Sequence, residues 1–132
     1  MMKWWLDKGI DGFRMDTVNM FSKVSDLPDG KMIKGYEYGD GSHYFLNGPR
    51  FHEYLQEINK ELFFKYKIMT VGETPRTTPE IALKYVNKDR NELNMVFHFE
   101  LMEIDRDPIN KWKPKEWKLT KLKKSLLSGM RA

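Results

Sequence analysis

The sequence contains no cysteine, and none of its asparagines belongs to an Asn-x-Ser/Thr acceptor for N-linked glycans. Disulfide bonds and glycans are typical of secreted proteins, so both absences favour a reducing compartment, and we expect a cytoplasmic protein. The chain also lacks a long apolar run, and charged residues interrupt its opening stretch after a few positions. We therefore expect neither a signal peptide nor a membrane span.

Metal-ligand patterns are missing as well. The histidines His43 and His52 have no carboxylate, cysteine or histidine at ligand spacing. The stretch around Gly30 resembles a calcium loop only superficially, because aligning this glycine puts Leu27 at a ligand position and Tyr36 where the bidentate glutamate belongs. We expect no metal ion and no cofactor.

Positive charge is concentrated in the last third of the chain. The 132 residues include 23 Lys+Arg and 19 Asp+Glu, a formal charge of +4, and seven lysines lie within 111–124 among two tryptophans. Lysines with aromatics can mark a nucleic-acid or anionic-membrane surface. The leucines here fall on one helical stripe, however, at Leu119, Leu122 and Leu126. The solvent face of a helix explains the lysines more economically, so we expect no nucleic-acid and no membrane partner.

Two short apolar runs, each ending in a carboxylate, organise the rest of the chain. They are residues 12–16 (GFRMD) and 70–73 (TVGE). Alternate side chains of an extended strand share a face, so Arg14 and Asp16 project together. A guanidinium beside a carboxylate favours its ionised form, which a carboxylate nucleophile requires. No cation stands within two residues of Glu73 in sequence, and an anionic Asp16 beside it would favour its protonated form, which suits a general acid.

Residues 50–66, between the two runs, have the apolar spacing of a helix, and Pro49 stands at its expected start. The apolar positions are Phe51, Tyr54, Leu55, Ile58 and Leu62. Strand, helix and strand make a right-handed crossover that brings both carboxylates to one end of neighbouring parallel strands. Strands about 4.8 Å apart allow carboxyl groups roughly 5 to 5.5 Å apart, the separation of a retaining glycosidase. On spacing alone, a lone Asp and a lone Glu at strand ends are more often solvated loop acids or helix caps.

The remaining pattern predicts one element before the first strand and a long connection after it. Residues 2–8 read as the end of a helix, closed by Gly9, that packs Trp4, Trp5 or both on a sheet. The connection 17–49 is long enough to be functional, and it is rich in glycine and aromatics. Aromatic faces suit sugar rings, but we favour simple packing for any single aromatic of this loop.

Beyond the second run we expect a helix and a third strand. Thr78 is placed to cap a helix that begins at Pro79 and ends near Asn87. Its inward face would carry Ile81, Ala82, Tyr85 and Val86. Residues 93–100 are dense in apolar side chains, as a strand covered on both faces should be. His98 within this strand is interpreted as a core residue rather than a catalytic one.

Four stretches carry a resemblance to a known family. They are GIDGFRMDTVNMFSK at 9–23, EYGDGSHYFLNGPRFHEYLQEIN at 37–59, MTVGETP at 69–75 and ELNMVFHFE at 92–100. In this order they resemble the catalytic barrel of the α-amylase superfamily, glycoside hydrolase family 13, and within it the α-glucosidases and oligo-1,6-glucosidases. The resemblance implies an α/β fold, a partial TIM (β/α)₈ barrel from about the end of the third helix through the sixth. Because such a barrel needs about 250 residues, we expect 1–132 to be one partial domain, an internal fragment.

The resemblance also implies a role for each site residue. Asp16 corresponds to the nucleophile, Glu73 to the acid/base, and Arg14 and Thr17 to substrate-binding positions. The residue after the nucleophile tends to be Val in isomaltase-like members and Thr in maltase-like ones, so Thr17 favours α-1,4-linked substrates. The implied reaction is retaining hydrolysis of α-glucosidic bonds in malto- or isomalto-oligosaccharides.

Two family blocks that grip the glucose, one on an earlier and one on a later strand, are absent from this sequence. We therefore expect the isolated chain to hydrolyse nothing measurable, with the missing barrel half supplied in a full-length protein. A glucosyl-transferring or isomerising member of the superfamily would share every motif present here. A non-catalytic, partner-binding relative is a second alternative, against which the retention of Arg14, Asp16 and Glu73 argues.

Overall fold

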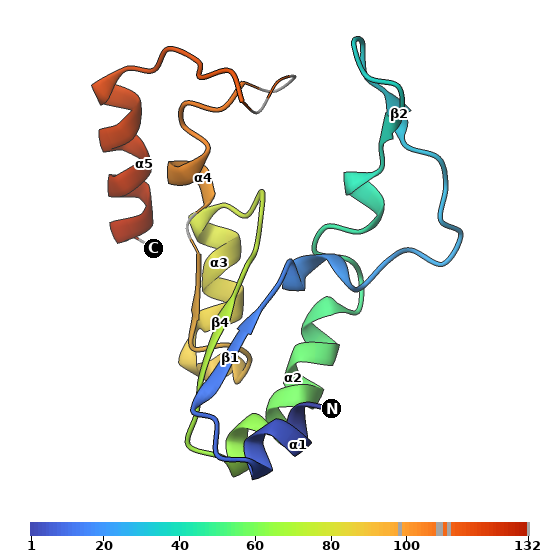
Figure 1. Cartoon of the computed structure of the whole chain (residues 1–132), viewed down its shortest axis with the longest axis vertical. Helices are drawn as coiled ribbons and strands as arrows, with labels where there is room; N and C mark the ends of the chain where they lie inside the picture. Colours follow the sequence, from blue (N-terminus) through green and yellow to red (C-terminus); the bar gives the residue numbers. More distant parts are fainter. Residues whose placement is uncertain (98, 108–109, 111, 132) are drawn as a thin grey trace.

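The computed structural model describes residues 1–97, 99–107, 110 and 112–131. The predictions made for His98 and for the lysine at 111 lie outside the described residues. The chain forms an open α/β arrangement in which a small parallel sheet is flanked by helices (Figure 1). The predicted α/β class is thus confirmed, and the described residues form an arc of strands rather than a closed barrel.

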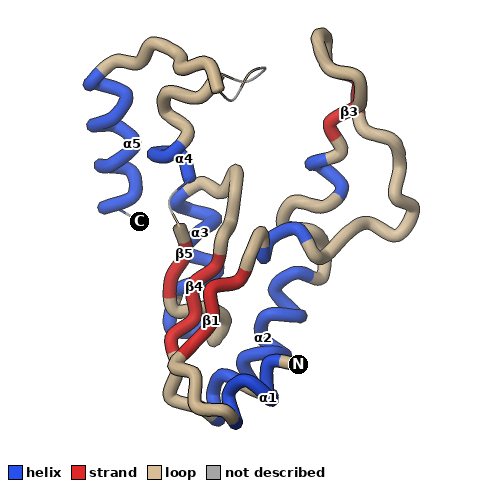
Figure 2. Tube along the Cα trace, viewed as in Figure 1, coloured by secondary structure: helices blue, strands red, loops and turns tan. Residues whose placement is uncertain are grey.

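Three parallel strands make the central sheet (Figure 2). They are β1 (Gly12–Met15), β4 (Met69–Gly72) and β5 (Met95–Val96), in the order β1-β4-β5. Met15 is in register with Gly72, so the two predicted runs end side by side. The crossover predicted from their spacing is confirmed.

Helices connect these strands and continue beyond them. The α-helices are α1 (Met2–Asp7), α2 (Phe51–Glu61), α3 (Pro79–Val86), α4 (Phe99–Met102) and α5 (Leu119–Arg131). Short 3₁₀ turns cover Val18–Met20, Ser42–Tyr44, Phe63–Lys65 and Lys88–Arg90. A two-stranded hairpin, β2 (Lys31–Met32) with β3 (Gly39–Asp40), lies in the long connection after β1.

The hydrophobic core lies between α2, α3 and the sheet. Its buried members are Val18, Phe51, Leu55, Tyr85 and Leu93. The rings of Phe51 and Tyr85 meet edge to face with centroids 5.0 Å apart, a favoured aromatic geometry. The helical faces predicted for α2 and α3 therefore supply this core, and the core fixes both helices behind the carboxylate-bearing strands.

The helix ends agree with the sequence in part. Gly9 has φ +88° just beyond α1, as predicted for a residue that ends a helix. Thr78 caps α3, its hydroxyl accepting from the Ile81 N–H at 3.4 Å. Pro49, however, does not open α2, because the helix begins at Phe51 after Arg50 as its cap.

The predicted packing of the tryptophans is wrong. Leu6 is the buried residue of α1, whereas Trp4 and Trp5 are half-exposed and stack edge to face on each other. A six-residue helix presents only one narrow inward face, and Leu6 occupies it.

The predicted third strand is also too long. Of its described residues, Met95 and Val96 pair with β4, and α4 begins at Phe99. Among the described residues β5 has a partner on one side only, so Met95 and Phe97 stay nearly half-exposed. The apolar run predicted a strand covered on both faces, and the described side chains of Met95 and Phe97 do not have that cover.

The lysine-rich stretch contains α5, but its leucine stripe is not buried. Leu119 and Leu126 are exposed, and among residues 119–128 of the helix Ser125 is the buried one. In the part of the chain that the structure describes, no helix is both long and apolar enough to cross a membrane.

The long connection after β1 returns close to where it began. The Asn47 N–H donates to the Asn19 carbonyl at 2.8 Å, and the Arg50 N–H donates to the Ser22 hydroxyl at 3.0 Å. Gly48 approaches so closely that a Cβ there would lie 1.8 Å from the Ser22 carbonyl oxygen. Only glycine allows this closure.

Candidate active site

Asp16 and Glu73 lie immediately beyond the carboxyl ends of β1 and β4. The Glu73 N–H donates to the Met15 carbonyl at 2.9 Å, and the Val18 N–H donates to the Glu73 carbonyl at 2.9 Å. Main-chain hydrogen bonding therefore joins the two segments past the last paired residues of the sheet. These bonds hold the backbone that carries each carboxyl group against the neighbouring segment.

One guanidinium contacts both carboxylates. Arg14 donates to Asp16 Oδ1 at 2.6 Å and to Glu73 Oε2 at 2.5 Å, each through a different terminal nitrogen. The first contact follows from strand alternation, as predicted. The second does not follow from the sequence neighbours of Glu73. Since Arg14 is in register with Val71, its side chain shares a face with Glu73 as well.

The two carboxyl groups differ in environment. The Asp16 side chain is 71% exposed, whereas that of Glu73 is 18% exposed. A hydrogen bond with Glu73, supported by the one from Arg14, lowers the pKa of Asp16 below its usual range. Asp16 is therefore an ionised, accessible carboxylate at neutral pH.

Thr17 brings its main chain rather than its hydroxyl to this pair. Its N–H donates to Glu73 Oε2 at 3.4 Å. The backbone there is left-handed, with φ +38°, a conformation that costs energy for a β-branched residue. The strained turn directs the chain away from β1 directly after Asp16.

Asn19 is a site residue that the sequence analysis missed. Its side chain is completely buried and contacts the loop that follows Glu73. The available signal was a polar residue inside the apolar stretch 18–21, three positions after Asp16. That pattern indicates a buried amide but does not identify its partner.

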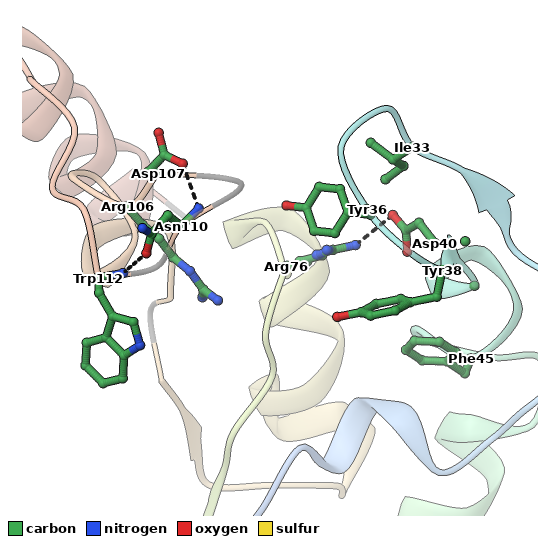
Figure 3. Close-up of a pocket in the computed structure, with 12 residues that line it drawn as sticks. Ile33, Tyr36, Tyr38, Asp40, Phe45, Arg76, Arg106, Asp107, Asn110 and Trp112 are labelled. Carbon is green, nitrogen blue, oxygen red and sulfur yellow. Dashed lines mark hydrogen bonds and ion pairs between the residues drawn. The ribbon is translucent and has the colours of Figure 1, made fainter.

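A pocket of about 660 Å³ opens between the long connection and the chain after α4 (Figure 3). Tyr36, Tyr38 and Phe45 of the connection line it, and Tyr38 is 72% exposed. Packing, which we favoured for these aromatics, therefore does not describe Tyr38. Arg76, from the loop after β4, pairs with Asp40 of the connection at 3.2 Å.

Among the residues that the structure describes, no three His, Cys, Asp or Glu side chains converge on a common point. The chemistry available at the site is that of two carboxyl groups and one guanidinium.

Comparison with known proteins agrees with this geometry. Residues 1–132 match the family described as alpha amylase, catalytic domain. The chain is 56% identical to an oligo-1,6-glucosidase of Parageobacillus thermoglucosidasius over 126 residues, which are 96% of this chain and 22% of that protein.

Solved structures give the same result. A trehalose-6-phosphate hydrolase of Bacillus licheniformis matches with a TM-score of 0.82 at 41% identity, over 97% of this chain and 22% of that one. An isomaltulose synthase mutant of Erwinia rhapontici, in complex with sucrose, matches with a TM-score of 0.84 at 33% identity, over 98% and 23%. The chain thus spans about a fifth of these proteins.

Proposed function

Because the chain belongs to the α-amylase catalytic-domain family of glycoside hydrolases, we propose that it carries the nucleophile and acid/base of a retaining α-glucosidase. Asp16 is the proposed nucleophile and Glu73 the proposed acid/base, with Arg14 and Thr17 at substrate-binding positions. The observation that carries this proposal is the single guanidinium shared by both carboxyl groups at the ends of adjacent parallel strands.

The proposed reaction is a double displacement. Asp16 Oδ attacks the anomeric carbon while Glu73 gives its proton to the glycosidic oxygen, so the bond to the leaving sugar breaks and a glucosyl ester forms. Glu73 then takes a proton from water, whose oxygen attacks the same carbon and releases Asp16. Two inversions leave the product in the α-configuration. Arg14 keeps Asp16 anionic before attack and stabilises it again when it leaves.

The activity proposed here belongs to a complete barrel. The chain spans 22% of the oligo-1,6-glucosidase it matches, and its sheet contains three strands. Residues from elsewhere in the barrel must complete the sugar pocket and cover the sheet edges. A disaccharide or oligosaccharide is the proposed substrate of that assembly.

The test is a graft. The 132-residue chain replaces the matching segment of the Parageobacillus oligo-1,6-glucosidase, and hydrolysis of nitrophenyl α-glucoside is measured. We expect turnover with retention, and a loss of kcat of about a thousandfold or more in Asp16→Asn and in Glu73→Gln. Asp29→Asn, an exposed acid of the connection, is the matched control and should leave kcat unchanged. Full activity of Asp16→Asn would refute the assignment.

The same grafted enzyme tests the preference between α-1,4 and α-1,6 bonds. Thr17 favours α-1,4 bonds, whereas the matched relative is named for α-1,6 bonds. We propose that maltose is hydrolysed faster than isomaltose and that Thr17→Val reverses the order. An unchanged ratio of kcat/KM values would remove Thr17 as a selectivity residue.

Glucosyl transfer or isomerisation is the second candidate, favoured by the likeness to an isomaltulose synthase. Such an enzyme would pass the glucosyl group to a sugar hydroxyl instead of water. Chromatography of the products from sucrose and from maltose separates the two candidates, because transfer yields new disaccharides and hydrolysis yields free monosaccharides.

A further inference from the structure

Asn19 occupies a position where the two carboxylate-bearing segments separate. It lies three residues after Asp16, in the 3₁₀ turn Val18–Met20, and none of its surface is exposed. A polar side chain buried to this degree needs hydrogen-bond partners, and the identity of those partners shows what it holds together.

The main partner belongs to the loop that follows Glu73. Asn19 Nδ2 donates to the Pro75 carbonyl at 2.9 Å and makes a longer contact of 3.4 Å with the Thr77 hydroxyl. A side chain two residues from the strained Thr17 therefore reaches the main chain two residues beyond Glu73. This contact links the segment after one carboxylate to the segment after the other.

The side-chain amide of Asn19 joins the segments after Asp16 and Glu73 at a position where no main-chain hydrogen bond of the described residues joins them. Main-chain bonding between the segments ends with the bond from Val18 to Glu73, and the Met20 N–H is used inside the turn, donating to the Thr17 carbonyl at 3.0 Å. Pro75 has no N–H to donate in return. The side-chain amide makes the link in this position.

A second set of contacts fixes Asn19 itself. The main-chain carbonyl of Asn19 accepts from the Asn47 N–H at 2.8 Å, and the side-chain Nδ2 of Asn19 lies 3.4 Å from Asn47 Oδ1. The hydroxyl of Tyr85, a buried residue of α3, donates to the same Asn47 oxygen. Asn19 is thus held by the end of the long connection and, through it, by the core.

From this geometry we infer that Asn19 is a positioning residue for the proposed reaction, setting the separation of Asp16 and Glu73 by clamping the loops that follow them. The inference rests on the proposed function. Asn19 does not touch the reacting atoms. It acts through the backbone of Pro75 on one side and through the turn after Asp16 on the other.

The test uses Asn19→Leu, which keeps the size of the side chain and removes its donor, in the same grafted enzyme. A misplacement of about 1 Å costs on the order of a hundredfold in rate, so we expect kcat to fall roughly ten- to a hundredfold while KM changes less than about threefold. The acid limb of the kcat/KM profile should move to higher pH, because the hydrogen bond from Glu73 no longer holds Asp16 in its ionised form.

Asn59→Leu is the matched control. Asn59 Nδ2 also donates to a carbonyl, that of Glu92 at 3.1 Å, but joins α2 to the loop before β5 instead of the two carboxylate segments. This control should lower the melting temperature and leave kcat, KM and the pH profile within about twofold. If Asn19→Leu behaves in the same way, with only a stability loss, the inference is overturned.

A measurement that needs no turnover distinguishes a failure of the inference from a failure of the proposed function. Carboxyl ¹³C NMR of the grafted enzyme follows the titration of Asp16 directly, and Asn19→Leu should move its midpoint to higher pH while Asn59→Leu should not. Asn19→Ser, whose smaller side chain leaves room for water, replaces the leucine variant if that variant does not fold. An inactive graft with a shifted midpoint refutes the proposed function alone, whereas an unshifted midpoint refutes the positioning role.

Discussion

At the scale of single residues, Arg14 joins the two carboxyl groups of the site. Its guanidinium binds both carboxyl groups, and the hydrogen bonds to Asp16 from Glu73 and from Arg14 lower the Asp16 pKa. A group with a depressed pKa in the folded state is ionised over a wider pH range, and its favourable contacts are lost as the pH falls through that value. The site should therefore lose activity on its acid side only well below neutrality.

Replacing Arg14 by glutamine tests this dependence. In the grafted enzyme, Arg14→Gln should raise the Asp16 pKa toward its ordinary value and shift the acid limb of kcat/KM upward in pH. Arg50→Gln is the control, because Arg50 forms a similarly exposed pair with Glu53 at the start of α2 and has no contact with Asp16 or Glu73 among the described interactions. Superimposable pH profiles for Arg14→Gln and the parent would contradict the prediction.

The sequence predicted the acidic pair but not the contacts that organise it. Arg14 and Asp16 follow from strand alternation, and Glu73 follows from a second run of the same kind. The contact between Arg14 and Glu73 needed the register of β1 against β4. The role of Asn19 needed the path of two loops, and loops carry no periodic signal from which a path can be inferred.

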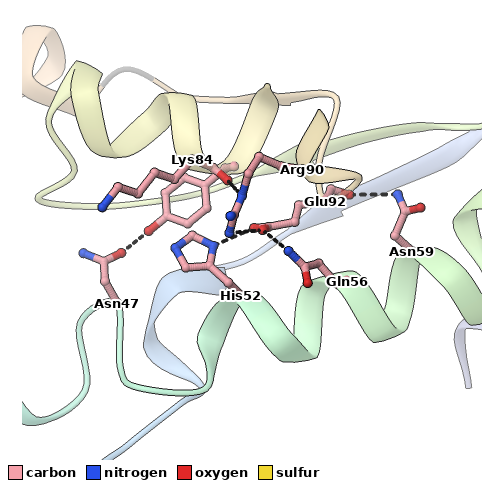
Figure 4. Close-up of polar contacts among 8 residues, drawn as sticks. Asn47, His52, Gln56, Asn59, Lys84, Arg90 and Glu92 are labelled. Atoms are coloured by element: carbon pink, nitrogen blue, oxygen red, sulfur yellow. Dashed lines mark hydrogen bonds and ion pairs between the residues drawn. The ribbon is translucent and has the colours of Figure 1, made fainter. Parts of the chain in front are cut away.

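At the scale of elements, a buried carboxylate holds α2 to the chain that leads into β5 (Figure 4). The Glu92 side chain is fully buried and binds His52 Nδ1 at 2.7 Å, Gln56 Nε2 at 3.2 Å and an Arg90 terminal nitrogen at 2.8 Å. Its backbone carbonyl accepts from Asn59. Three partners on two elements satisfy this carboxylate, as a buried charge requires.

Removing the charge should weaken this junction. Glu92→Gln keeps the size of the side chain but loses its charge-assisted bonds, which contribute about 1.5 to 3 kcal/mol each at most. Because the basic partners can turn to solvent, we expect a loss of about 2 to 3 kcal/mol in unfolding free energy, measured by urea denaturation. Glu61→Gln, which breaks an exposed pair with Lys65, should cost about 0.5 kcal/mol or less. Equal losses in the two variants would argue against the role of Glu92.

The elements themselves were predicted where local rules decide them. The Thr78 cap, the Gly9 terminus and the buried face of α2 are fixed by capping, by backbone freedom and by periodicity. The ends of β5 were not predicted correctly. A strand ends where its pairing ends, and the pairing of Met95 depends on Val71, which is far away in sequence. The exposed Trp4 and Trp5 have the same cause, since apolar composition indicates burial without naming the surface that provides it.

At the scale of the whole molecule, the chain has the open surfaces of part of a barrel. β1 and β5 are the edges of the sheet, and Met69 and Met95 on its strands are about half-exposed. Unpaired strand edges with exposed apolar side chains favour pairing with another chain.

The isolated 132-residue chain should therefore be inactive and self-associating. We expect no measurable hydrolysis of nitrophenyl α-glucoside and, by size-exclusion chromatography with light scattering, species larger than a monomer at micromolar concentration. The grafted enzyme is the control, because the rest of its barrel covers the same sheet edges. Turnover by the purified chain that disappears in Asp16→Asn would show that this part of the barrel is sufficient.

The closure of the long connection has a consequence for how specificity can diversify. Asn19 and Asn47, like Ser22 and Arg50, join its two ends, so residues 23–46 form a segment tied off at its base. Lengthening such a segment costs little, because closure entropy grows only slowly with length. The tyrosines that line the pocket belong to this segment, whereas the carboxylates do not. Insertions, deletions or substitutions within residues 23–46 would therefore change the pocket wall and leave the positions of Asp16 and Glu73 unchanged.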